Sequence, residues 1–459
     1  MTLTTSNVTS GFIDLATFDE IEKYLYGGSD ATAYFVRETR KSTWFTQVPV
    51  ALSRSSGEPK FGQQCSWSIS RAGDYLLHSW LRATLPKIDN SDNNISENGQ
   101  MSASHVWCRN VGHNLIEECA ITFNDLVAAR FDNYHLDFWT AFTVPASKRV
   151  GYNNMIGNVS ALNNPAANMI DCSEAQVDDL PRYTINVPLP LFYTRDSGVA
   201  LPTAALPYND MRITIKLRKS KELLLDSCGQ RFIDTTETNI GQLEDVDLWC
   251  NYAIVSNDER KRMACAPRDI LIEQVQTAPK QSYNTGSATR MDIRFSHAIK
   301  VLFFAVRNET VFNEWSNYES KRFECQNVDL SGNLGVVIGD GLIVSNENSV
   351  DPIKSVSLVY ENTNRLSNMG SDYFSLVNPY YHAPSIPEVT GYHCYSYSLD
   401  FASLDPMGST NYGKLTNVSL IAESCGVLEG ETTDYSMVVT AVNNNIIRVS
   451  GGALGFPVL

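Results

Sequence analysis

The most regular hydrophobic pattern in the chain lies between residues 188 and 217. Four prolines interrupt its first part, up to Pro207, and remove backbone donors that a regular helix needs. From residue 211 to 217 apolar and polar residues alternate, and the apolar face consists of Met211, Ile213, Ile215 and Leu217. A period of two with β-branched residues is typical of a strand with one face on a core and one in water. We therefore predict that this is the closing strand of a first β domain, with its apolar face buried and a second β domain behind it.

Strand-like segments recur on both sides of this stretch. In the first half they cover residues 65–69, 75–85 and 115–123, and aromatic residues at mixed spacing between 133 and 157 predict one or two short helices. The run 298–306 is almost continuously apolar, as expected for a strand covered on both faces. The other strand-like segments of the second half are 248–255, 270–275, 291–295, 356–360, 392–401, 415–421 and 435–442.

Short strands separated by long polar excursions, such as residues 87–104 and 158–182, suit a β-sandwich or jelly roll, whose loops gather at the ends. We predict an all-β protein of two sandwich domains joined near residues 218–245, with domain limits of 29–219 and 220–459. A faint similarity between Met211-Arg212-Ile213 and Ile447-Arg448-Val449 falls at the end of each half. It is too short to prove a duplication.

The clearest helix pattern lies near the N-terminus, at residues 17–28. Thr17 and Glu20 have the spacing of a capping box, and Gly27 with Gly28 ends the helix. The apolar face of this helix consists of Phe18, Ile21, Tyr24 and Leu25. The helix either packs on its own domain or forms an arm, residues 1–28, that docks on a neighbour or a membrane. The sequence pattern favours neither alternative over the other.

Composition and charge narrow the classes of function. Hydrophobic residues make up 43% of the 459 residues and charged residues only 19%, which is consistent with large buried surfaces, including surfaces between subunits. The net charge of -15 argues against direct nucleic-acid binding, which needs concentrated Lys and Arg. No apolar run reaches the ~18 residues that span a bilayer, and the N-terminus has no signal-peptide pattern. Ten scattered cysteines without a CxxC pair favour free thiols in a reducing compartment.

Motifs for catalysis or cofactor binding are missing from the sequence. It contains no P-loop, GxSxG, HExxH or strand-linked GxGxxG motif, so we expect no cofactor and no catalytic residues. The adjacent acids at 117–118 and 178–179 fit solvated side chains better than an acid–base pair. Four possible zinc ligands lie within fifteen positions, but their spacing matches no compact zinc motif, and core thiols with polar histidines are the favoured interpretation: His105, Cys108, His113 and Cys119.

Several longer stretches resemble the major capsid proteins of iridoviruses, within the wider group of large double-stranded DNA viruses with icosahedral shells. The similar stretches are colinear over almost the whole chain: Ser10–Thr17, Tyr26–Gly28, Phe123–Asp125, Gly151–Gly157, Arg195–Pro202, Leu206–Asn209, Arg294–Ala298, Leu358–Asn362, Asp405–Gly413 and Gly455–Leu459. Residues 87–104, 311–350 and 423–434 depart from the family pattern, and the last of these lacks its glycine-rich run.

The resemblance implies two consecutive eight-stranded jelly rolls per chain and no enzymatic activity. It further implies a homotrimeric, pseudo-hexagonal capsomer in the virion, assembled in the host cytoplasm. Its partners would be neighbouring capsomers, minor capsid proteins and the inner viral membrane, with no direct contact to nucleic acid. An enzyme or carbohydrate-binding protein built on β-sandwiches is the alternative, because jelly rolls also form lectins and cupins.

Overall fold

The computed structural model describes residues 12–14, 16–17, 19, 21, 43–88, 105–163, 179–226, 241–310, 312–320, 336–337, 343–344, 350–425 and 434–456. The chain divides into two compact units, residues 1–44 and residues 45–459, and each is described by itself. No helix in the described ranges is both long enough and apolar enough to cross a membrane.

In the first unit the described residues include helical positions at 12–14, 16 and 21. The Thr17 hydroxyl donates a hydrogen bond to the Asp14 carbonyl oxygen at 2.6 Å. Residue 17 is in a turn, residue 19 is not helical and residue 21 is helical, so the predicted helix over residues 17–28 stays a prediction. Glu20, the other half of the predicted capping box, lies outside the described residues.

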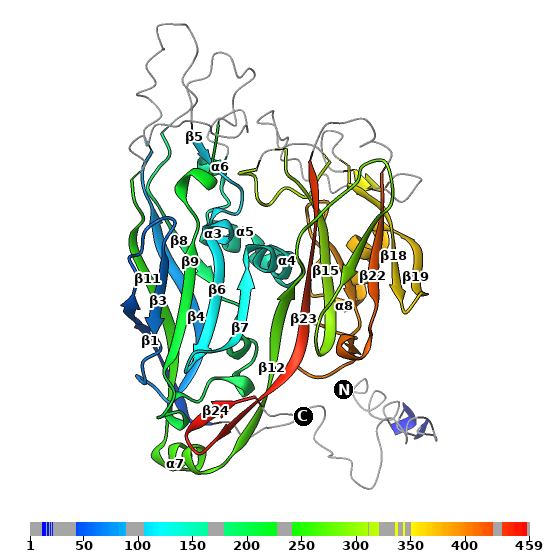
Figure 1. The fold of residues 1–459 in the computed structure, drawn as a ribbon. Helices are drawn as coiled ribbons and strands as arrows, with labels where there is room; N and C mark the ends of the chain where they lie inside the picture. Colours follow the sequence, from blue (N-terminus) through cyan, green and yellow to red (C-terminus); the bar gives the residue numbers. More distant parts are fainter. Residues whose placement is uncertain are drawn as a thin grey trace, which may run out of the picture. The chain divides into compact units, whose positions relative to one another are not determined.

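The first half of the second unit is a sandwich of two antiparallel sheets (Figure 1). One sheet has the order β1-β11-β4-β8 and consists of Phe45–Ala51, Glu244–Val255, Tyr75–Leu85 and Tyr183–Pro188. The other has the order β2-β3-β9-β6-β7 and consists of Ser53–Ser56, Gln64–Ser68, Met211–Leu217, Ile116–Phe123 and Leu126–Asp132. A separate pair joins β5 (His105–Trp107) to β10 (Leu224–Asp226).

The second half repeats this architecture. Its first sheet runs β12-β23-β15-β20 and consists of Arg268–Thr277, Tyr435–Ser450, Ala298–Asn308 and His393–Ser396. Its second sheet runs β14-β22-β18-β19 and consists of Thr289–Ile293, Val418–Ser424, Ile353–Tyr360 and Thr363–Gly370. Short strands extend the first sheet (β13, Gln281–Ser282; β21, Thr410–Asn411; β24, Ala453–Gly455) or form a separate pair (β16, Val336–Val337; β17, Ile343–Val344).

The two halves share one topology. Without β2, β5 and β10 the first half has eight strands, and without β13, β16, β17, β21 and β24 the second half also has eight. Numbered along the chain within each half, strands 1, 8, 3 and 6 form one sheet in that order, and strands 2, 7, 4 and 5 form the facing sheet. Strand β1 is therefore equivalent to β12, β7 to β19, β9 to β22 and β11 to β23. The predicted repeat of Arg212 and Arg448 is wrong, because Arg212 lies on β9 and Arg448 lies on β23.

The predicted burial of the apolar face of the strand at 211–217 is confirmed. Met211, Ile213, Ile215 and Leu217 are all buried, and Ile213 lies between Trp67 of β3 and Ile121 of β6. However, β9 is central in its sheet and does not close the domain. Strand β11 closes it by pairing with β1 and β4, so the expected boundary at residues 219 and 220 precedes a strand of the first sandwich.

Short helices connect the strands of both halves. In the first half they are α3 (Val111–Leu115), α4 (Asn133–Thr143), α5 (Ala146–Ile156) and α6 (Ser160–Asn163), and α7 (Asn257–Cys265) connects the halves. The second half contributes a π-helix, η6 (Tyr373–Val377), and α8 (Asn378–His382). Short 3₁₀ turns are η1 (Phe192–Thr194), η2 (Ser197–Val199), η3 (Thr203–Ala205), η4 (Ser220–Glu222) and η7 (Tyr412–Lys414).

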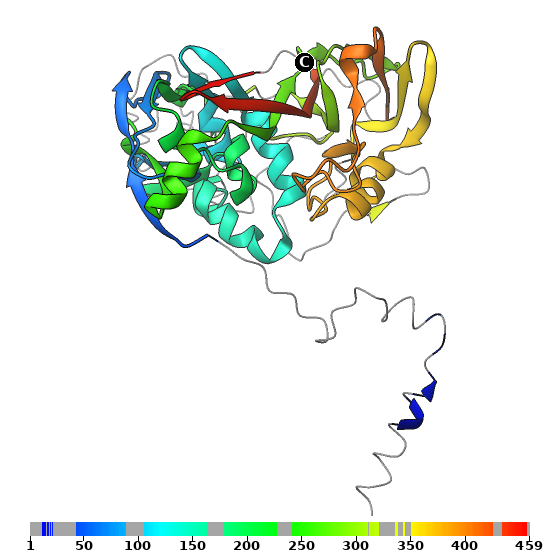
Figure 2. The same ribbon diagram turned by 90° about the horizontal axis from the view of Figure 1, so that it is seen from below.

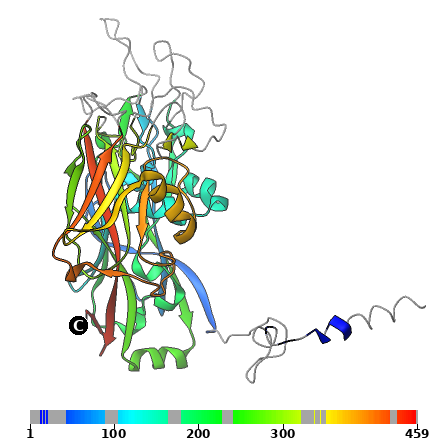
Figure 3. The ribbon, with the colours of Figure 1, turned by 90° about the vertical axis from the view of Figure 1, so that its right-hand side faces the viewer.

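The cyan helices α4 and α5 lie in the angle between the two sandwiches when the molecule is viewed from below (Figure 2). Figure 3, which faces the second sandwich, shows the gold helical segment around α8 on the same side of the strands as these cyan helices. The predicted short helices between residues 133 and 157 are therefore confirmed, and they occupy the junction of the two halves.

Candidate functional site

The junction between the two sandwiches is built on helix α4. The Asp132 carboxylate caps this helix by accepting a hydrogen bond from the backbone nitrogen of His135 at 3.0 Å. Leu136 points into the core of the first sandwich, whereas Phe138 and Phe142 belong to a cluster shared with the second. A helix that is apolar on more than one side is buried on more than one side, which explains the mixed aromatic spacing in its sequence.

Helix α4 packs against the face of strand β15 that points away from the core of the second sandwich. The ring of Phe303 lies 6.2 Å from that of Phe138 and 5.4 Å from that of Phe142, both in stacked orientation. Neighbouring residues of β15, such as Leu302 and Phe304, face the core of the second sandwich instead. The predicted strand covered on both faces is thus confirmed, because β15 has the sandwich core on one side and the junction on the other.

At the polar centre of the junction lies Asp137, whose carboxylate is fully buried. One oxygen contacts His113 Nδ1 at 2.6 Å and accepts a hydrogen bond from Asn110 Nδ2 at 3.2 Å. The other accepts hydrogen bonds from the hydroxyls of Ser316, at 2.6 Å, and Tyr318, at 3.1 Å. Because Ser316 and Tyr318 belong to the second half of the chain, the carboxylate joins the two sandwiches.

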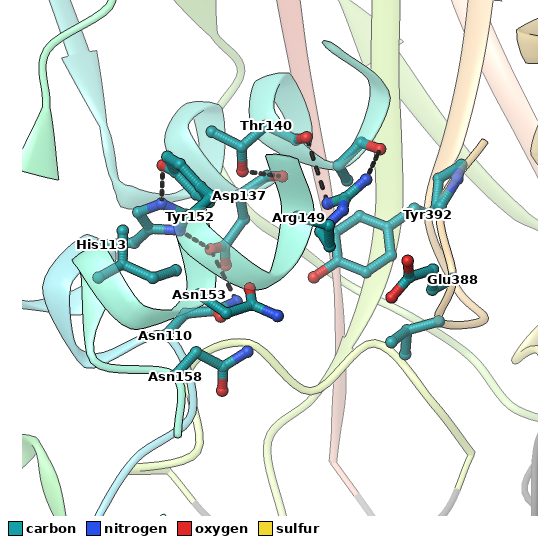
Figure 4. A pocket seen from close by; sticks show the side chains of 14 residues that line it. Asn110, His113, Asp137, Thr140, Arg149, Tyr152, Asn153, Asn158, Glu388 and Tyr392 are labelled. Atoms are coloured by element: carbon teal, nitrogen blue, oxygen red, sulfur yellow. Dashed lines mark hydrogen bonds and ion pairs between the residues drawn. The ribbon is translucent and has the colours of Figure 1, made fainter. Parts of the chain in front are cut away.

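A small cavity of about 90 Å³ opens beside Asp137 (Figure 4). His113 Nε2 lies 2.6 Å from the Tyr152 hydroxyl, so that Asp137, His113 and Tyr152 form a hydrogen-bonded chain along the cavity wall. Burial, followed by the nearby Asp137 charge, raises the pKa of Tyr152. The Tyr152 phenol is therefore kept protonated, and the chain of contacts joins α3, α4 and α5.

A buried ionic cluster connects the sandwiches a second time. Glu273 of β12 lies 2.5 Å from Lys300 Nζ of β15 and 2.9 Å from Arg195 Nε of the first half. The Arg195 guanidinium also lies 3.4 Å from the centre of the Trp139 ring, in a cation–π contact. Burial lowers the pKa of Arg195, and the charge of Glu273 opposes that shift. Removing Glu273 would leave both buried cations, Lys300 and Arg195, without their shared carboxylate.

Trp315 forms a third connection. Its ring centre lies 3.6 Å from the guanidinium of Arg218, which follows β9, and 4.2 Å from that of Arg307 on β15. Its indole nitrogen donates a hydrogen bond to the Glu222 carbonyl oxygen at 2.9 Å. The indole is therefore held between one arginine from each half.

The predicted zinc candidates do not converge on a metal site. Cys119 is buried in sheet strand β6, and burial raises the pKa of the Cys108 thiol to about 12. His113 belongs to the Asp137 network, and His105 lies in β5. Within the described ranges, no three His, Cys, Asp or Glu side chains are placed to hold a metal ion. That the protein binds no metal stays a prediction, which elemental analysis of purified protein would test.

The predicted acid pairs have ordinary partners where the structure describes them. Glu117 accepts a hydrogen bond from Lys216 Nζ at 2.5 Å, and Asp179 lies 3.1 Å from Lys87 Nζ. Asp178 lies outside the described residues. Of the predicted assembly-arm residues only Ile21 is described, and it is 71% exposed; Phe18, Tyr24 and Leu25 also lie outside.

The junction residues were not predicted from sequence. A signal was present, because the aromatic segment 133–142 contains a polar residue, Asp137, that has no place in a simple apolar face. The sequence pattern could not identify the hydrogen-bond partners of Asp137, because Ser316 and Tyr318 lie 179 and 181 positions further along the chain.

The fold has counterparts among solved structures. The "PBCV-1 virus capsid, quasi-atomic model" is 18% identical with a TM-score of 0.71, covering 93% of this chain and 100% of that chain. The "Faustovirus major capsid protein" is 11% identical with a TM-score of 0.67, covering 92% and 93%. At these identities the likeness concerns the fold alone, and it places the chain in the class of double jelly-roll proteins.

Sequence comparison then defines the family. The description "Major capsid protein N-terminus" matches residues 33–255, and "Large eukaryotic DNA virus major capsid protein" matches residues 259–455. The major capsid protein of Invertebrate iridescent virus 6 is 55% identical over 100% of both chains. That of Lymphocystis disease virus 1 (isolate Darai) is 46% identical over 99% of both. The chain belongs to the major capsid protein family of large eukaryotic DNA viruses, in its iridovirus branch; it is a structural component of the virion capsid and not an enzyme.

Proposed function

We propose that three copies of this chain form a pseudo-hexagonal capsomer that tiles the icosahedral shell of the virus. The observation that carries the proposal is the duplicated topology, in which β1-β11-β4-β8 corresponds to β12-β23-β15-β20. A trimer of chains with two equivalent jelly rolls presents six similar barrels, so a molecule with threefold symmetry can pack in a nearly sixfold environment. The low charged fraction of 19% is consistent with extensive subunit interfaces.

The partners of the capsomer would be neighbouring capsomers, minor capsid proteins and the inner viral membrane, with assembly in the host cytoplasm. The net charge of -15 supports a shell protein that does not itself hold nucleic acid. We assign residues 1–28 to an assembly arm, with Phe18, Ile21, Tyr24 and Leu25 as its docking face. The exposure of Ile21 supports a face that is available for a partner.

Light scattering coupled to size-exclusion chromatography tests the trimer. We expect a mass of about three times 51.1 kDa, and electron microscopy of the same peak should show uniform particles with a hexagonal outline. A monomer that persists across a wide concentration range would contradict the proposal.

A further inference from the structure

The junction inside one chain brings together two particular sheet edges. Strand β7 ends one sheet of the first roll, strand β12 ends one sheet of the second, and the two lie side by side (Figure 1). Gln274 Nε2 of β12 donates a hydrogen bond to the Ala128 carbonyl oxygen of β7 at 2.7 Å. Arg130 and Phe131 from β7 share a cavity of about 510 Å³ with Val275 and Gln276 from β12. The edges meet through side chains, because the two strands belong to separate sheets.

Each of these two edge strands has an equivalent in the opposite roll, and both equivalents are exposed. By the shared topology, β7 corresponds to β19 and β12 corresponds to β1. Within the described part of the chain β1 pairs only with β11 and β19 only with β18. In β1 only Val50 is even partly buried, and no residue of β19 is fully buried. The two strands lie on opposite sides of the second unit (Figure 1).

The chemistry of β1 also points to a covered strand. It contains no charged residue, and Phe45 and Val48 are 47% and 38% exposed. Proteins usually protect a free sheet edge with charge, a bulge or very short length, since such an edge is prone to association. Within β1, only Pro49 is of a type that discourages pairing with a further strand, because it has no backbone N–H. An uncharged seven-residue edge is consistent with a strand that is buried in the assembled protein.

We infer that β1 of one copy packs against β19 of the next copy, repeating between chains the contact that β12 and β7 make within a chain. This inference rests on the proposed trimer and names its interface. Because the contact joins different surfaces of the two copies, each copy contributes β1 to one neighbour and β19 to the other, and three such contacts close a ring.

Site-specific photo-cross-linking tests the contact. A benzoylphenylalanine replaces Thr46, which is exposed on β1, and a control protein carries it at Val150, which is 74% exposed on α5. Each variant is confirmed as a trimer by light scattering, irradiated at high dilution and analysed by denaturing gel and peptide mass spectrometry. We expect the probe at position 46, and not the probe at 150, to link to residues 363–370 of another chain.

A trimer in which position 46 links elsewhere, or to nothing, would overturn this interface and leave the proposed trimer intact. A wild-type protein that forms no trimer would contradict the proposed function itself, and with it this contact. A charge variant provides a second measurement if the probe disturbs folding. We expect the trimer of Val48→Lys to dissociate at a protein concentration at least tenfold higher than the trimer of Val150→Lys. Dissociation of both variants at the same concentration would overturn the inference.

Discussion

Buried polar side chains connect the two jelly rolls, and Asp137 is one of them. Its four hydrogen-bonding contacts come from both halves of the chain. A buried carboxylate of this kind adds little net stability over an apolar residue of the same shape, but its removal leaves several partners unsatisfied. The residue therefore acts mainly in fixing how the rolls dock.

We expect Asp137→Ala to lower the free energy of unfolding by about 3–5 kcal/mol, because His113, Ser316 and Tyr318 lose a shared buried acceptor. Denaturant titration of the purified protein measures the change, with the exposed Asp405→Ala as a matched control that we expect within about 0.5 kcal/mol of wild type. If both variants unfold at the same denaturant concentration, Asp137 has no such docking role.

His135 predicts how stability depends on pH. It is fully buried, and among the described residues neither ring nitrogen has a hydrogen-bond partner. Burial, followed by the nearby Arg195 charge, holds the pKa of His135 well below its usual 6.5. The unfolded chain therefore binds a proton near pH 6.5 that the folded chain does not, and the free energy of unfolding falls as pH drops below that value.

We expect His135→Gln to flatten the loss of melting temperature between pH 7.5 and 5.5, since glutamine has no proton to bind in the unfolded state. The loss attributable to His135 is at most about 1.4 kcal/mol per pH unit. His78→Gln, at an exposed position on β4, should keep the wild-type pH profile. A profile of His135→Gln identical to wild type would assign the acid sensitivity to another group.

At the scale of single elements, the sequence pattern was sufficient to locate strands whose faces have clearly defined surroundings. The alternation of 211–217 and the apolar run of 298–306 correspond to β9 and β15, because local patterning follows the faces that a strand buries. The pattern did not show that β11 pairs with β1, some 200 positions earlier, since pairing partners leave no local trace. That is why the predicted boundary between the rolls came before β11. The expectations for residues 89–104 and 164–178 lie outside the described residues.

Strand β9 gives a direct test at this scale. Ile213 is fully buried in the centre of its sheet, so Ile213→Asp places an unpaired charge between Trp67 and Ile121. We expect this variant to yield no soluble protein, whereas Arg212→Ala, one position away on the exposed face, should be soluble with a melting temperature near wild type. Measuring soluble yield for both separates the two faces, and normal yield from Ile213→Asp would refute the assignment of its side chain to the core.

At the scale of the whole molecule, duplication explains the architecture better than any single site does. The two rolls share their strand order although the one sequence similarity noted between them connects non-equivalent strands. Topology is therefore retained where residue identity is not, because many apolar sequences satisfy one alternating pattern. The docking of the rolls could not be predicted, since it depends on contacts such as Asp137 with Ser316 that only the folded chain brings together.

The N-terminal residues offer the last test, because they precede every strand that the structure describes. The first of these, β1, begins at Phe45, so deletion of residues 1–28 removes no described strand of either roll. In the helix that the sequence predicts, Phe18, Ile21, Tyr24 and Leu25 would form a short apolar face; so short a helix is unstable alone in water and requires a surface to pack on. Burying these side chains on a neighbour would contribute several kcal/mol, at roughly 1.5–3 kcal/mol each before the cost of ordering.

We therefore expect the protein lacking residues 1–28 to remain a soluble trimer with a melting temperature near that of the full chain, but to fail in shell assembly. The full chain with Ile21→Asp alone should show the same defect, because one charge on the docking face opposes its burial. Light scattering and thermal unfolding report the first part, and electron microscopy of assembly reactions reports the second. An insoluble truncated protein, or one that melts far lower, would instead make the N-terminal helix part of the first core.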